Sequence, residues 1–106
     1  MAWVYLLVAG ALEVVWAYTM KLSNGFTRPV PVVITLVAMI ASFGLLSMAM
    51  RDLPLGTAYT VWTGIGAVGA FIVGVVFLGE HLSAGRVLAA ALIVADLVLM
   101  KWTSVE

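Results

Sequence analysis

The chain has 106 residues, 65% of them hydrophobic and only 9% charged, with a formal net charge of +0 at pH 7. Soluble domains are about 45–50% apolar and about 25% charged, so this composition indicates a membrane protein. Cysteine is absent and His81 is the only histidine, which excludes disulfides, thiol nucleophiles and metal sites built from cysteine or several histidines.

Four apolar stretches are long enough to cross a bilayer, which takes about 20 mostly apolar residues in a helix. They cover residues 2–20, 30–50, 55–78 and 86–102. Because they use nearly the whole chain, we expect a single four-helix transmembrane domain over residues 1–106, without a soluble domain. The short connections favour antiparallel neighbours, as in an up-down-up-down all-α membrane protein.

The first stretch carries one charged side chain, Glu13, near its centre. A charge at that depth costs at least about 2.5–3.5 kcal/mol on insertion scales, so an intramembrane acid indicates a function. A secretory signal peptide would begin with positive charge and keep an uninterrupted apolar run. No Lys or Arg precedes Lys21, and Glu13 interrupts the run. We therefore interpret this stretch as a retained helix.

Turn-forming residues separate the first two stretches. Asn24-Gly25 is a turn signal, and Pro29 and Pro31 are placed to begin the second helix. Before the fourth stretch, Ser83 is placed to cap a helix.

The third stretch is rich in glycine, and two interpretations of these glycines stay open. Gly66, Ala70 and Gly74 form a ridge of small residues spaced by four, which is typical of close helix packing. Gly64 and Gly66 would also allow the helix to bend.

Helical spacing groups the candidate binding residues into one stripe on each of the first three helices. The stripes hold Leu6, Gly10, Glu13, Ala17 and Met20; Thr35, Met39, Ser42 and Ala49; and Tyr59, Trp62, Gly66 and Ala70. Trp16 lies one turn from Glu13. Together these residues predict a chamber with one carboxylate, aromatic walls that attract cations, and hydroxyl groups of Tyr59 and Ser42 to orient the carboxylate. An interfacial aromatic belt is the alternative for the tryptophans, but Trp16 and Trp62 lie too deep to fit it well.

A carboxyl group in such a chamber holds either a proton or a cation, but not both. That exclusion is enough to couple proton and cation movement in opposite directions, as in a secondary transporter. The chain has no phosphate-binding loop for an ATP-driven pump. No nucleophile–base pair or metal constellation is evident, so we expect neither an enzyme nor a bound cofactor. A non-transporting membrane assembly, in which Glu13 only specifies helix pairing, is the alternative from another class.

The distribution of cations predicts how the chain inserts. One side of a four-helix chain carries Arg51 and Lys101, and the other carries Lys21, Arg28 and Arg86. Orientation normally follows a Lys/Arg excess on the cytoplasmic side, and this near-even split sets almost none. Four helices do not easily enclose a chamber and also alternate its access. We therefore expect a dimer of oppositely inserted copies around a site at the bilayer midplane.

Three runs of residues resemble the small multidrug resistance family of bacterial exporters, and the resemblance covers essentially the whole chain. The runs are EVVWA at 13–17, LPLGTAY at 53–59 and VWTGIGA at 61–67. Trp16 after Glu13 and Thr63 after Trp62 are similar to the guanidinium-exporter subtype rather than the quaternary-ammonium multidrug subtype.

This resemblance implies an antiparallel, dual-topology dimer in the bacterial inner membrane that exchanges protons for guanidinium or small hydrophobic cations. It implies that Glu13 of both subunits binds proton or substrate, that Gly64 and Gly66 allow the bend, and that the fourth helix is the main dimer contact. The residues it implies around the carboxylate are Trp16, Ser42, Tyr59 and Trp62. The expected partners are these cations, protons, the lipid bilayer and a second copy or a homologous subunit, with no nucleic acid. A broad quaternary-ammonium exporter and one subunit of a heterodimeric exporter are the alternatives.

Asp96 departs from the family pattern, which has a small or apolar residue at this position. An intramembrane acid indicates a function by default. Structural roles are also open: a protonated acid that joins two fourth helices, or a partner of Lys101. Asp96 would also suit a chain that pairs with a non-identical subunit.

Overall fold

The computed structural model describes residues 1–103 and contains four α-helices, with no strand among these residues. The helices are α1 (Ala2–Leu22), α2 (Pro29–Ala49), α3 (Leu55–Phe77) and α4 (Ala84–Thr103). This confirms the all-α architecture. Helix α1 runs to Leu22 rather than to residue 20, and α4 begins at Ala84 rather than at residue 86.

Three of the described helices, α1, α2 and α3, are long and apolar enough to cross a membrane, so the protein is a multi-pass membrane protein. Helix α4 has 20 residues but carries Arg86, Asp96 and Lys101. Arg86 and Lys101 lie near its two ends, where long cationic side chains reach the membrane interface, and only Asp96 lies in its interior. That α4 crosses the membrane stays a prediction.

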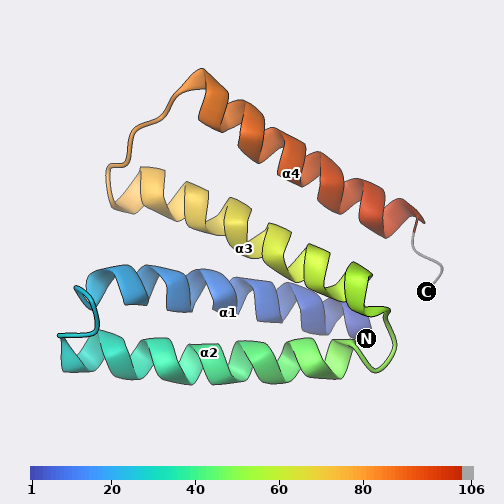
Figure 1. Cartoon of the computed structure of the whole chain (residues 1–106), viewed down its shortest axis with the longest axis horizontal. Helices are drawn as coiled ribbons and strands as arrows, with labels where there is room; N and C mark the ends of the chain where they lie inside the picture. The colour runs from blue at the N-terminus through green and yellow to red at the C-terminus, as the bar shows by residue number, and fades with distance from the viewer. Residues whose placement is uncertain (104–106) are drawn as a thin grey trace.

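Helix α1 packs between α2 and α3, whereas α4 lies outside this group and packs mainly along α3 (Figure 1). Its Lys101 also lies over the Trp3 ring of α1, 4.5 Å from the centroid. The molecule measures 43 × 34 × 16 Å along its principal axes. Because a helix with its side chains is about 10–12 Å wide, the arrangement is little more than one helix thick. None of the described residues of α4 is buried, so the chain leaves this helix open to a partner or to lipid.

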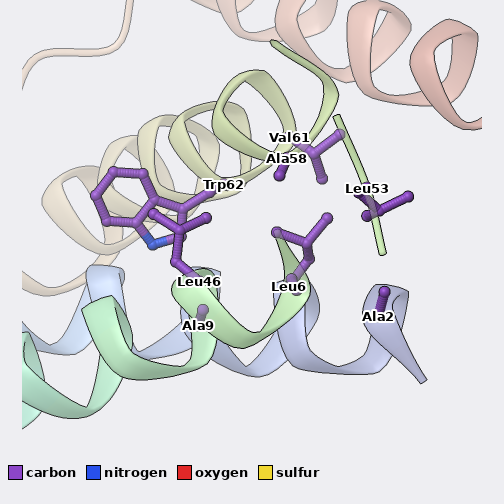
Figure 2. Packing of buried hydrophobic residues seen from close by; sticks show 9 residues of the cluster. Ala2, Leu6, Ala9, Leu46, Leu53, Ala58, Val61 and Trp62 are labelled. Carbon is purple, nitrogen blue, oxygen red and sulfur yellow. The ribbon is translucent and has the colours of Figure 1, made fainter. Parts of the chain in front are cut away.

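A hydrophobic core lies at the end of the helices near the N-terminus. Figure 2 shows its members from α1, α2, the following loop and α3: Ala2, Leu6, Ala9, Leu46, Ala49, Leu53, Ala58, Val61 and Trp62. Small side chains on α1 and α3 let these two helices approach closely, and Leu46 of α2 closes the cluster. This core fixes the relation of α1 to α3, on which the site described below depends.

The turns form as expected from their residues. Asn24 and Gly25 adopt positive φ angles of 51° and 72°, as does Phe26 at 66°. The buried Ser23 hydroxyl holds this loop, because it accepts a hydrogen bond from the Phe26 N–H at 3.0 Å. Pro29 begins α2. The Ser83 hydroxyl accepts the Arg86 N–H at 3.2 Å, which confirms Ser83 as a cap of α4.

Glycines of α1 and α3 serve two different contacts. A methyl group at Gly10 would overlap Ile65, and one at Gly69 would overlap Val14, so these two positions let α1 and α3 pack closely. Gly66 and Gly74, of the predicted small-residue ridge, instead each lie against a carboxylate side chain, that of Glu13 and of Glu80 respectively. The helix backbone thus provides two places where an acid rests on α3.

Candidate functional site

Glu13 lies at the middle of α1 and its side chain rests on α3. Its carboxylate is so close to Gly66 that a Cβ atom there would overlap Oε1 and Cδ. Gly66 is the central residue of α3. Both residues are therefore at the middle of a helix long and apolar enough to span a membrane, so we expect the carboxylate near the bilayer midplane.

The Glu13 carboxylate has an unused acceptor. Its Oε1 atom is buried and has no hydrogen-bond partner within residues 1–103. A buried polar atom without a partner costs about 1–3 kcal/mol, and more for a charged group. Such atoms call for an explanation: a proton would remove the charge of the carboxylate, and a bound cation would pair with it.

Trp16, one turn further along α1, presents an unused donor. Its Nε1 atom is also buried without a hydrogen-bond partner in the described part of the chain. An acceptor on Glu13 and a donor on Trp16 thus occur three residues apart on one helix, a spacing that places side chains on the same face. A planar cation would donate to the Glu13 acceptor and lie on the face of the Trp16 ring, but it has no acceptor for the Trp16 Nε1–H.

Ser42 joins all three packed helices through its hydroxyl group. The fully buried hydroxyl donates to the Ala9 carbonyl of α1 at 2.7 Å and accepts the Trp62 Nε1–H of α3 at 3.0 Å. Both hydrogen-bonding functions of the hydroxyl are therefore engaged. No hydrogen bond joins Glu13 to Ser42 or Tyr59 in the region 1–103, so Ser42 positions Trp62 here rather than the carboxylate.

An aromatic run connects α1, α2 and α3. Trp16 meets Phe43 edge-on at 6.2 Å between ring centroids, Phe43 meets Trp62 at 5.7 Å, and Trp62 meets Tyr59 at 5.6 Å. Trp62 is 7% exposed, whereas Tyr59 is 53% exposed. The structure therefore brings Trp16, Tyr59 and Trp62 into one assembly, with Ser42 hydrogen-bonded to its centre.

Phe43 is the member that sequence reasoning missed. It is the only aromatic residue of α2 and directly follows Ser42. Adjacent residues point about 100° apart around a helix, so Phe43 lies outside the predicted stripe of α2 that contains Ser42. The isolated aromatic in an aliphatic helix was the available signal.

The two glycines proposed to bend α3 make different contacts. Gly66 faces the Glu13 carboxylate, and a methyl group at Gly64 would lie 2.6 Å from Cδ2 of Leu97 in α4. Helix α3 continues unbroken from Leu55 to Phe77. The bend stays a prediction, and these contacts show that both glycines also provide space.

Asp96 faces a groove of about 280 Å³ between α3 and α4. The groove is also lined by the hydroxyl side chains of Tyr59, Thr60 and Thr63. The Asp96 side chain is exposed, which distinguishes it from the buried Oε1 of Glu13. No group of three or more acidic or histidine side chains suited to a metal ion occurs in residues 1–103.

Comparison with known proteins identifies the family. The family model described as Small Multidrug Resistance protein matches residues 1–93. A protein of Citrobacter freundii called guanidinium exporter is 57% identical over 101 residues, covering 95% of this chain and 96% of its own. A guanidinium exporter of Yersinia pseudotuberculosis is 56% identical over 104 residues, covering 98% and 100%. The chain belongs to the small multidrug resistance family.

Proposed function

We propose that this protein is a proton-coupled antiporter that exports guanidinium and small guanidinyl cations across the bacterial inner membrane. Relatives that match nearly its full length are named guanidinium exporters, which supports the substrate class. The observation that carries the proposal is the buried Oε1 of Glu13 at the middle of α1, which has no hydrogen-bond partner among the described residues. An acceptor atom of this kind is free to bind a proton or a cation and to release it during each transport cycle.

The transport cycle follows from competition at one carboxylate. When Glu13 holds a proton, it has no charge to attract a cation, and when it holds a cation, it is closed to the proton. Aromatic faces attract a desolvated cation by about 2 kcal/mol or more, so Trp16, Tyr59 and Trp62 form the walls of the site. Ser42 fixes the Trp62 indole and thereby the geometry of the wall.

The working unit is an antiparallel dimer of two oppositely inserted copies. One chain is only 16 Å thick and leaves α4 without a buried residue in its described range, which suits a helix that packs against a partner. The Lys/Arg distribution, two residues against three, supports insertion in both orientations. In this dimer α4 is the main contact, and both Glu13 carboxylates face the shared site.

The test is electrical recording from protein reconstituted in liposomes, with guanidinium as the substrate and an inward or outward pH gradient. Glu13→Gln should abolish proton-coupled current while the dimer stays folded, because the amide has nearly the same shape but no exchangeable charge. Asp52→Asn is the matched control, since Asp52 is an exposed acid in the loop between α2 and α3. Full activity of the Glu13→Gln protein would end the single-carboxylate mechanism.

Two further measurements separate the alternatives. Guanidinium affinity should weaken as the pH falls, because protons occupy the same carboxylate, and a constant affinity from acid to neutral pH would contradict the competition. A panel of guanidinyl and quaternary ammonium cations then tests the substrate range. Strong currents with quaternary ammonium cations and none with guanidinium would favour the quaternary-ammonium type of exporter.

A further inference from the structure

A second groove lies at the opposite end of the helices from the hydrophobic core. It has a volume of about 300 Å³ and is formed by the last turns of α1 and α3 and the beginning of α4. Its charged and aromatic lining consists of Tyr18, Lys21, Phe71, Glu80 and Arg86. The transport cycle described above uses none of these side chains.

The groove already contains a guanidinium group, that of Arg86. Its Nη2 atom is 3.8 Å from Oε1 of Glu80, and its Cζ atom lies 5.3 Å from the centroid of the Phe71 ring. Its Nη1–H donates to the carbonyl oxygen of His81. A carboxylate, an aromatic face and a carbonyl acceptor are the groups that would recognise a free guanidinium ion.

The ion pair between Arg86 and Glu80 is weak. Strong Arg–carboxylate pairs have N···O distances of about 2.7–2.9 Å, and the Glu80 contact is much longer. The two side chains are 42% and 40% exposed, and exposed pairs of this kind contribute little to stability. A free cation of the same shape therefore competes with a weak ion pair at Glu80, and it would take over the Arg86 contacts with the His81 carbonyl and the Phe71 ring.

The Glu80 carboxylate contacts a glycine of α3, as the Glu13 carboxylate does. It rests on Gly74, as that of Glu13 rests on Gly66. These glycines are eight residues apart on α3, which corresponds to about 12 Å along the helix. Between them the groove is lined by the small side chains of Ala17, Ala67 and Ala70, which leave room for a small cation.

We propose that Glu80, the Phe71 ring and the His81 carbonyl form a second guanidinium site at the mouth of the route to Glu13, occupied at rest by the side chain of Arg86. A guanidinium ion displaces the Arg86 head group, which is already partly in solvent, and then passes along the small-residue floor to Glu13. Lys21 lines the same groove and weakens the site for free cations, so that it holds them only briefly. This inference rests on the proposed transport of guanidinium.

The experiment measures binding of guanidinium chloride by isothermal titration calorimetry in the Glu13→Gln protein, where the central site carries no charge. Arg86→Gln added to this protein removes the resident competitor and should tighten binding about 3- to 10-fold. Glu80→Gln should abolish the binding, and Phe71→Leu should weaken it about threefold. Asp52→Asn is the control for net charge and should leave the affinity unchanged.

The proposal predicts opposite effects on guanidinium affinity: an increase in Arg86→Gln and a loss in Glu80→Gln. If the Glu80–Arg86 pair only fastens the loop to α4, Arg86→Gln and Glu80→Gln should lower the melting temperature alike and change guanidinium binding in the same direction, which would overturn the proposal. Absence of Glu80-dependent binding, with normal guanidinium transport by the unmodified protein, would overturn this site and leave the proposed function intact. Glu80-dependent binding in a protein that transports no guanidinium would support the site and refute the proposed function.

Discussion

Replacing Gly66 with alanine places a methyl group where the Glu13 carboxylate lies. The added Cβ would overlap Oε1 and Cδ, and it would lie 2.8 Å from Cγ of Glu13. Ordinary contacts begin at about 3.4 Å, so Cγ must retreat by about 0.6 Å and the carboxylate by more. The change therefore acts on the position of the proposed binding group, not on its chemistry.

The size of the effect follows from this overlap. Overpacking of this kind costs about 1–3 kcal/mol. Because the Glu13 side chain ends in a flexible carboxylate that can move away, we expect the cost to fall mainly on binding. At about 1.4 kcal/mol for each tenfold change, guanidinium affinity should fall about 5- to 150-fold.

Gly64→Ala is the matched control. It adds the same methyl group two residues away on α3, where it would lie 2.6 Å from Cδ2 and 3.2 Å from Cγ of Leu97, an apolar side chain of α4. Calorimetric titration with guanidinium and thermal unfolding in detergent should be measured on both variants. Gly64→Ala should lose about 1–3 kcal/mol of stability, because its overlap is with an apolar side chain of α4, while its guanidinium affinity stays within about twofold.

Equal losses of affinity in the two variants would refute this reasoning. They would show that Gly64 and Gly66 act together through the bend of α3, as the family resemblance implies. Unchanged affinity in Gly66→Ala would show instead that the position of the carboxylate does not govern binding.

Three other changes test the hydrogen bonds of Ser42, the dual topology of the dimer and the role of Asp96. Ser42→Ala leaves the Trp62 Nε1–H without its acceptor and the Ala9 carbonyl without its side-chain donor, so it should lower the free energy of unfolding by about 1–3 kcal/mol; unchanged stability would contradict the described network. Two lysines added at the C-terminus should hold that end in the cytoplasm and lower transport, and an oppositely biased copy should restore it; a wild-type C-terminus detected on one side only would refute dual topology. Asp96→Asn should transport with little change in pH dependence, as expected of a structural acid, and loss of proton coupling in an intact dimer would make Asp96 part of the mechanism.

The four helices could be predicted from the sequence because bilayers impose a simple rule. Backbone groups without water must bond within their own segment, so an apolar run of about 20 residues becomes a helix. Asn24-Gly25, Pro29 and Ser83 act locally, and their roles in turns and helix ends were also readable. Helix ends such as Leu22 and Ala84 extended past the apolar runs, because a helix does not end where hydrophobicity does.

Glu13 was identifiable from sequence alone because a lone acid in an apolar helix is costly wherever the helix packs. Its surroundings were not. The sequence assigned Ser42 to the carboxylate, but the hydroxyl is engaged by Ala9 and Trp62, and Phe43 completes the aromatic run. Helical periodicity gives the face on which a side chain lies but not the helix that it meets or the rotation between them.

Tertiary structure alone decided which residues of α3 face the acids. Gly66 rests against Glu13 and Gly74 against Glu80, although the sequence presents both as members of one packing ridge. The association of Arg86 with Glu80 and Phe71 likewise depends on how the loop before α4 folds back over α3. The apolar composition and the helical periodicity of the sequence determine where each helix forms, because helix formation depends on local interactions with the bilayer. Where the helices touch depends on packing between segments far apart in the chain, and the structure was needed to reveal it.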